Sequence, residues 1–399
     1  MKKSCLFNPS MHTKFSFLYY NITVSLSIRK SLESVGQFVL RQSPLAVLFA
    51  GILYFILKTG IRGILPWASF DPVYQFPSLT PGYSSYSLGL LAIAHLFEAE
   101  SEIRFFTLNL TILILFTFVF YMSLRKIVPS PKIATILFLV CLYSPVGVVL
   151  AGNIGRHDLL TIAGFALFFT SQKPRLKYFW LLVGVAGSPE HFIVGWTFAY
   201  ITAIVVRDFS LKLLCRRALL VSISFSMPVF IYVYNQTESP DRLTNIIRET
   251  GLMKLAIRNF LFSFPLELYS YFGILIPILL YIFSQIYSRD KSRFKALIIL
   301  FSLPILLNIM LVDKTRDYVI AMLASIIVLI KSEQKQGSLK ILTHALKSNS
   351  NLPFFVGILI PILIFFPAIE VTFEGVPRSP HFWTYAKIIE FCSTNNWFC

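Results

Sequence analysis

Apolar residues recur along the chain in runs that are separated by short clusters of Lys, Arg, Pro and Ser. A helix needs about 20 residues to cross a hydrocarbon core of about 30 Å. The pattern predicts an all-α, polytopic integral membrane protein of about eleven transmembrane helices, within a range of ten to twelve, whose N-terminus lies inside. The expected spans are residues 44–65, 105–124, 133–152, 157–172, 178–189, 191–206, 218–234, 271–287, 296–312, 317–330 and 353–369.

These spans divide the chain into three parts. The first is a cytoplasmic N-terminal segment in which Phe15 to Ile28 is expected to lie on the membrane surface as an amphipathic stretch. A transmembrane helical domain and a short extracytoplasmic tail follow. The parts are residues 1–43, 44–369 and 370–399.

Two of the expected extracytoplasmic loops are long, residues 66–104 and 235–270. The first contains four prolines and a predicted helix at Ser87–Phe97. The second is predicted to hold one or two amphipathic helices between Asp241 and Leu268. Both loops could partly cover a site on the outer side.

Composition and charge agree with this threading. The 399 residues are 56% hydrophobic and only 14% charged, which is more apolar surface than a soluble domain can bury. The net charge of +17 is unevenly placed, because 24 of the 36 Lys and Arg fall on the predicted inner side and 15 of the 19 acids on the outer side. This is the positive-inside bias of a plasma membrane protein, and it argues against a nucleic-acid partner. A bacterial inner membrane is the expected location.

The five cysteines have no metal-ligand spacing. Cys392 and Cys399 lie together in the outer tail, where either a disulfide or two free thiols is compatible with the sequence.

Several predicted spans are too short to reach both interfaces. Between Asp158 and Lys173 there are 14 residues, which is about 21 Å of helix. The interval from Lys177 to Glu190 and that from Asp317 to Lys331 are similarly short. If the lysines lie in the cytoplasmic headgroups, three charged clusters lie at a similar depth below the outer surface.

The three clusters are therefore candidates for one polar cavity that opens outward, because ionisable groups at membrane depth are costly unless they pair or face water. In the third cluster, Asp313, Arg316 and Asp317 share one helix face, so that Arg316 can lie between two carboxylates. The alternative reading is that tilted or re-entrant helices end in ordinary solvated ion pairs. The candidates are Arg156, His157, Asp158, Glu190, His191, Arg316 and Asp317.

Asp71 is a separate candidate. It follows the first span, among aromatic residues and before Pro72. An acid in such surroundings can act as a general base, although an Asp before Pro also begins turns.

The arrangement resembles the GT-C superfamily of membrane glycosyltransferases, which use polyprenyl-phosphate sugars on the extracytoplasmic side. In that family a first span leads into a long outer loop with a catalytic acid near its start, and Asp71 occupies that place. The runs Gly155-Arg-His-Asp-Leu-Leu, Ser188-Pro-Glu-His and Asp313-Lys-Thr-Arg-Asp are similar to motifs of bacterial proteins with this topology. The resemblance covers residues 44–330.

The resemblance implies a function and roles for the candidates. The chain would move a sugar from a polyprenyl-phosphate donor to an extracytoplasmic acceptor, with Asp71 as the base. Arg156 and Arg316 would face the lipid phosphate, while His157, Asp158, Glu190 and His191 would orient them or contact sugar hydroxyls. The paired acids common after the first span are absent, and so is a large soluble domain after the last span.

Other readings stay open on the sequence alone. No cofactor is specified: a divalent cation is compatible with the chemistry, but no metal motif is present. The same charges could bind a lipid-linked or anionic solute in a transporter or flippase, or serve a lipid-linked polysaccharide polymerase or ligase.

Overall fold

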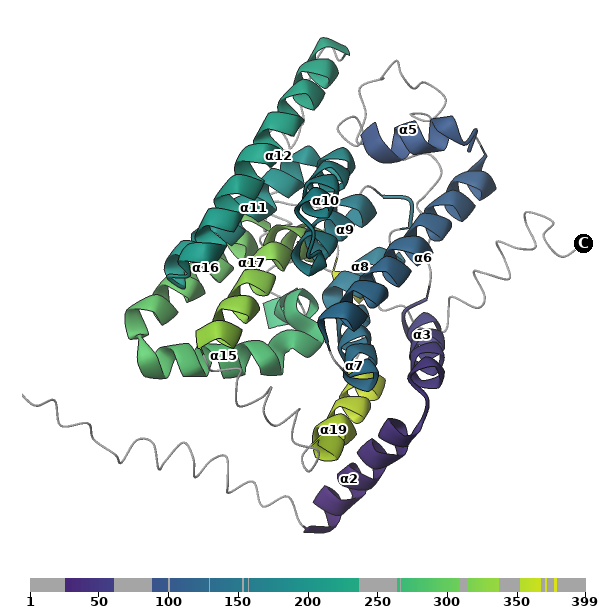
Figure 1. The fold of residues 1–399 in the computed structure, drawn as a ribbon, viewed down its shortest axis with the longest axis vertical. Coiled ribbons are helices and arrows are strands. Elements are labelled where there is room, and N and C mark those ends of the chain that lie inside the picture. The colour runs from purple at the N-terminus through teal and green to yellow at the C-terminus, as the bar shows by residue number, and fades with distance from the viewer. Residues whose placement is uncertain are drawn as a thin grey trace, which may run out of the picture.

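The structure is a computed structural model of the whole chain, drawn in Figure 1. It describes residues 26–60, 88–99, 101–128, 130–152, 154–156, 158–236, 264–265, 267–308, 314–336, 352–366, 370–371 and 377–378.

Within these residues the fold is all-α, as the hydrophobic pattern predicts. The described α-helices are α2 (Leu26–Arg41), α3 (Pro44–Thr59), α5 (Leu88–Leu96), α6 (Glu102–Ile127), α7 (Pro131–Leu142), α8 (Pro145–Gly152), α9 (Asp158–Thr170), α10 (Pro174–Gly187), α11 (Pro189–Val205), α12 (Phe209–Gln236), α15 (Ile276–Arg289), α16 (Lys291–Asn308), α17 (Lys314–Gln336) and α19 (Leu352–Phe365). A 3₁₀ turn, Gly273–Leu275, precedes α15. Strands β1 (Glu370–Val371) and β2 (Pro377–Arg378) form a short antiparallel pair.

Several of these helices are those of an integral membrane protein. Among the described residues, three are long and apolar enough to cross a bilayer: Ile103–Ile127, Phe209–Ile231 and Glu267–Arg289. The number rises to five if the bent pairs α2–α3 and α7–α8, with bends of 111° and 62°, each form one span. Helices α9 and α19 are shorter apolar helices.

The local sequence explains where many helices begin and end. Pro occupies the first turn of α3, α7, α10 and α11, where its missing N–H costs no hydrogen bond. The Ser43, Ser101 and Ser130 side chains accept hydrogen bonds from first-turn amides of α3, α6 and α7. The expected helix at Ser87–Phe97 is confirmed as α5. The expected surface stretch Phe15 to Ile28 lies mostly outside the described residues, and α2 begins near its end.

The main core lies between α9, α10, α11, α12 and α17. Trp196 of α11 is fully buried, and its ring contacts those of Phe165, Phe168 and Phe169 from α9 and Phe192 of α11. Small residues allow α9 and α10 to approach closely, because a Cβ on Gly164 would meet the backbone of Gly184. A second core joins α15, α16 and α17 around Tyr318 and Met322.

Helices α9 and α17 run parallel, and contacts at both ends show this. At their N-terminal ends, Asp158 of α9 pairs with Arg316 of α17. At their C-terminal ends, the Lys331 ammonium of α17 donates to the backbone carbonyl of Phe169 in α9. Helix α11 begins at the same end, because His191 in its first turn contacts Asp317. Three helices therefore present their N-termini to one region.

A set of ion pairs joins the helices at the other end of the bundle, away from the N-termini of α9, α11 and α17. Lys335 bonds Asp208 at 3.0 Å, and Arg289 pairs with the fully buried Glu333. Arg207 lies 3.6 Å from Asp290. These residues lie at or just after the C-termini of α11, α15 and α17, and they hold those helix ends together.

Helices α2 and α19, far apart in the sequence, lie side by side (Figure 1). Gly36 faces the backbone of Pro353 and Gly357, and Gly357 faces the carbonyl of Leu32, so closely that neither glycine has room for a Cβ. Small residues of this kind let membrane helices pack backbone to backbone.

Candidate functional site

The candidate site forms where α9, α11 and α17 begin. Asp158, Glu190 and Asp317 stand in the first turns of these helices, where a negative side chain is favoured by the unpaired amides. Pro189 starts α11 directly after Ser188, which places His191 in the first turn of the helix. The sequence therefore directs several ionisable groups to the same end of the bundle.

Arg316 is at the centre of a chain of contacts. Its Nη1 lies 3.6 Å from Oδ2 of Asp158, and its Nη2 lies 3.3 Å from Oδ1 of Asp317. The Asp158 and Arg316 side chains are only 2% and 5% exposed. A guanidinium buried to this extent needs counter-charges, and two carboxylates supply them.

His191 extends the chain toward the surface. Its Nε2 lies 3.4 Å from Oδ1 of Asp317, and its Nδ1 is 2.7 Å from the hydroxyl of Ser188. The imidazole is held at both nitrogens. Its side chain is 27% exposed, against 10% for Asp317, so His191 is the most accessible member of the chain.

The structure brings four of the seven clustered candidates into direct contact: Asp158, His191, Arg316 and Asp317. Arg156, in the turn before α9, and Glu190 are partly exposed. His157 lies outside the described residues, as does Asp313, which the sequence pairs with Arg316. The second carboxylate on Arg316 is Asp158, from a different helix. Asp71 also lies outside the described residues.

A buried polar network borders these contacts at the start of α17, and it lies outside the three charged clusters predicted from the sequence. The Thr315 hydroxyl lies 2.7 Å from that of Ser270. The Tyr271 hydroxyl donates to the fully buried Glu267 carboxylate at 3.3 Å, and its ring stacks on Tyr318. An acid within the apolar run Phe-Pro-Leu-Glu-Leu-Tyr is the signal that could have indicated it.

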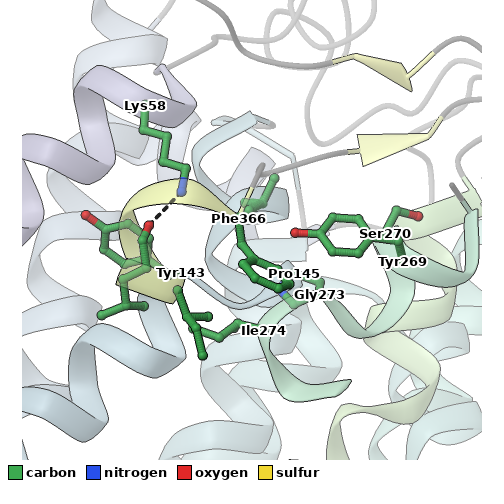
Figure 2. A pocket seen from close by; sticks show the side chains of 11 residues that line it. Lys58, Tyr143, Pro145, Tyr269, Ser270, Gly273, Ile274 and Phe366 are labelled. Carbon is green, nitrogen blue, oxygen red and sulfur yellow. Dashed lines mark hydrogen bonds between the residues drawn. The ribbon is translucent and has the colours of Figure 1, made fainter. Parts of the chain in front are cut away.

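A pocket lies on the other side of Ser270 (Figure 2). Its walls come from the end of α3, the bend between α7 and α8, the helical residues that precede Gly273, and the end of α19. Lys58 is its cation. Lys58 is the single charge between Arg41 and Arg62, which is the pattern that marks functional positions in apolar segments. The lining residues are Lys58, Tyr143, Pro145, Val148, Tyr269, Ser270, Gly273, Ile274, Ile362, Leu363 and Phe366.

Metal binding has no donor set in the described part of the chain, where no group of three or more His, Cys, Asp or Glu is suitably placed. The chemistry that these residues can perform is electrostatic: they can hold a charged group, orient it and exchange a proton through His191.

Fold and site together define an all-α protein with several candidate transmembrane helices and a buried charged cluster where three helices begin. No protein-family profile, curated protein or solved structure matches the chain.

Proposed function

We propose that this chain is a membrane glycosyltransferase that moves a sugar from a polyprenyl-phosphate donor to an acceptor on the extracytoplasmic side. The observation that carries the proposal is the chain Asp158–Arg316–Asp317–His191 at the converging N-termini of α9, α11 and α17. Buried, interlinked charges in a membrane protein mark a functional site by default.

The proposed topology has eleven crossings with the N-terminus inside, in a bacterial inner membrane. The contacts of the basic residues support it, because they join groups that the threading assigns to one side. On the inner side Lys132 donates to the carbonyl of Leu40, and Lys335 pairs with Asp208. On the outer side Arg316 pairs with Asp158. The charged cluster would then face the extracytoplasmic space.

In the proposed reaction, the acceptor hydroxyl gives its proton to the carboxylate of Asp71 while its oxygen attacks the anomeric carbon. The bond from that carbon to the phosphate oxygen breaks, and the lipid phosphate leaves with the electron pair. A preorganised charged environment stabilises the phosphate in this step. Arg156 and His157 are the residues proposed to stabilise the phosphate. Arg316, which two carboxylates already neutralise, is better suited to holding Asp158 and Asp317 in place.

The alternative is a proton-coupled transporter or flippase for a lipid-linked or anionic solute. One observation favours it: a buried chain of carboxylates with a histidine at its accessible end is also what a proton relay requires. A transporter would use the same residues without breaking a bond.

One experiment separates the two. The purified chain in nanodiscs is incubated with radiolabelled polyprenyl-phosphate sugars and a mixture of acceptor glycans, and release of the polyprenyl phosphate is followed. We expect release by the wild type and a loss of about a hundredfold or more in Asp71→Asn, the scale of general base catalysis. Arg104→Gln, at an exposed arginine of α6, is the control.

Equal turnover by Asp71→Asn and the wild type would remove Asp71 from the mechanism. If the protein cleaved no donor but moved a polyprenyl-phosphate sugar across the bilayer of proteoliposomes, the transporter function would replace the glycosyltransferase function.

A further inference from the structure

The pocket around Lys58 is built from helix ends and breaks, which the proposed threading places between the middle of the membrane and its outer surface. Figure 2 shows Lys58 and Tyr143 on one side of the pocket and Tyr269 on the other. The hydroxyl of Tyr269 points toward the interior of the pocket. Ile274, Ile362 and Phe366 supply apolar walls. One cation and hydroxyl groups beside apolar side chains match the chemistry of a ligand with a small anionic head and a hydrocarbon tail, and the cavity of about 20 Å³ must widen to admit the head.

The charge of Lys58 is only partly satisfied by neutral groups. Its ammonium donates to the carbonyls of Leu363 at 2.6 Å and Ile364 at 3.0 Å, which belong to the last turn of α19. It also lies 5.6 Å from the ring centroid of Tyr143. An ammonium has three donors, and these two bonds use two of them. Among the described residues no carboxylate forms an ion pair with Lys58.

Arg316 presents the opposite case. It is buried between Asp158 and Asp317, so an anion placed against it would meet two negative charges as well as one positive charge. An anion beside Lys58 would meet one cation and no described carboxylate partner. Opposite charges attract more strongly at low dielectric, so this difference in local net charge favours Lys58 over Arg316 as the counter-charge of a phosphate.

The two places are physically connected. Ser270 lines the pocket, and its hydroxyl lies 2.7 Å from that of Thr315, the residue before Arg316. A head group bound at Lys58 is therefore separated from the charged cluster by one pair of hydrogen-bonded side chains.

We infer that this pocket binds the phosphate head of a lipid monophosphate, with Lys58 as the counter-charge. The hydrocarbon chain lies against Ile274, Ile362 and Phe366. The inference deepens the proposed function, on which it rests for identifying the lipid as the glycosyl carrier. It places the lipid phosphate at Lys58 in place of Arg156 and His157.

The test is equilibrium binding of tritium-labelled farnesyl phosphate to the full chain in phosphatidylcholine nanodiscs, beside farnesol and inorganic phosphate. We expect Lys58→Gln to weaken farnesyl phosphate binding by about ten- to a hundredfold, the scale of one charge-assisted hydrogen bond, and to leave farnesol binding unchanged. Lys132→Gln is the matched control, because Lys132 also donates to a backbone carbonyl, that of Leu40.

Unchanged farnesyl phosphate affinity in Lys58→Gln would overturn the inference, and so would inorganic phosphate binding as tightly as farnesyl phosphate. If Lys58→Gln did not fold, Lys58→Arg should keep the affinity and Phe366→Ala, on the apolar wall, should weaken farnesyl phosphate and farnesol alike. A loss of farnesyl phosphate affinity in Lys58→Arg, together with unchanged binding in Phe366→Ala, would also overturn the inference.

Lys58-dependent binding by a protein that transfers no sugar would support the inference and remove the glycosyltransferase proposal. If the wild type transferred sugar and Lys58→Gln bound farnesyl phosphate normally, the inference would fall and the glycosyltransferase proposal would stand.

Discussion

At the residue scale, the clearest feature is the neutralised arginine. Arg316 is 5% exposed and has a carboxylate from its own helix and another from α9. Removing one partner of such a group leaves an uncompensated charge in a dry environment, whereas replacing the whole set by apolar residues does not.

We therefore expect Arg316→Gln to destabilise the protein by about 3–5 kcal/mol, because two buried carboxylates lose their shared cation. The measurement is thermal unfolding of the detergent-purified protein. The Arg316→Met, Asp158→Leu, Asp317→Leu triple variant should recover much of the loss. Arg104→Gln, at an exposed position, should stay within about 0.5 kcal/mol of the wild type. A stable Arg316→Gln protein would contradict the structural role.

Asp208 permits a prediction of pH dependence. Burial opposes its ionisation, but the Leu211 amide, the Ser210 hydroxyl and the Lys335 ammonium together hold its pKa below the ordinary value of 3.8. A carboxyl with a lowered pKa in the folded state stabilises the protein above its unfolded pKa, and that contribution disappears as the pH falls through the folded value.

Unfolding temperatures measured from pH 7 down to pH 3 should therefore fall more steeply in the wild type than in Asp208→Asn. The variant should already be less stable at pH 7. Lys335→Gln should behave in the same direction, since it removes the cation that favours the charged carboxylate. Parallel curves for the wild type and Asp208→Asn would show that this carboxyl does not titrate in the unfolding equilibrium.

At the scale of the elements, helices are positioned by close backbone contacts as well as by large side chains. Gly36 and Gly357 remove the side-chain layer between α2 and α19, and Arg29 lies over the ring of Phe354 at 5.4 Å from its centroid. Lys58 of α3 bonds the carbonyls at the far end of α19. Helix α19 is thus held near both ends by the N-terminal helix pair.

Gly36→Val should separate α2 from α19, at a cost of about 1–3 kcal/mol for forced overpacking. The measurement is cross-linking by a short bifunctional thiol reagent in an Arg29→Cys, Phe354→Cys background, because the Arg29 guanidinium lies over the Phe354 ring. Cross-linking should fall markedly with Gly36→Val and persist with Ser34→Val, whose position on α2 is exposed. Equal cross-linking in both would contradict the packing.

At the scale of the whole molecule, charge contacts sort into two groups at opposite ends of the bundle. Basic and acidic residues at or just after the C-termini of α11, α15 and α17 pair with one another, and so do the acids and the arginine at the starts of α9 and α17. A chain threaded alternately through a bilayer must give this result, because water and headgroups exist only at the two surfaces.

The corresponding prediction is measured by labelling single cysteines with a membrane-impermeant reagent in a cysteine-free background. Arg175→Cys and Ser292→Cys should react only after the cytoplasmic side is opened. Ser239→Cys should react in intact cells. If Ser239→Cys reacted only from the cytoplasm, the threading would be wrong by one span, and the charged cluster would face the other compartment.

Much of the element layout follows from the sequence alone. The expected intervals 105–124 and 178–189 fall on α6 and α10, because apolar runs, initial prolines and serine caps act within a few residues. The interval 133–152 is correct as a segment, but it is two helices bent by 62° at Tyr143 and Ser144. Counting residues between charges also places Asp158, His191 and Arg316 at a common depth, since helix rise is constant.

Only the tertiary structure decides which of these groups touch. That Arg316 is shared by Asp158 and Asp317, and that Lys58 reaches the last turn of α19, depend on which helices are neighbours and on their rotation. Sequence pattern records depth and the apolar face of a helix, but not the partner across it. Helix neighbours are chosen by close packing between segments distant in the chain, such as Gly36 against Gly357, and this information is absent from any local run of residues.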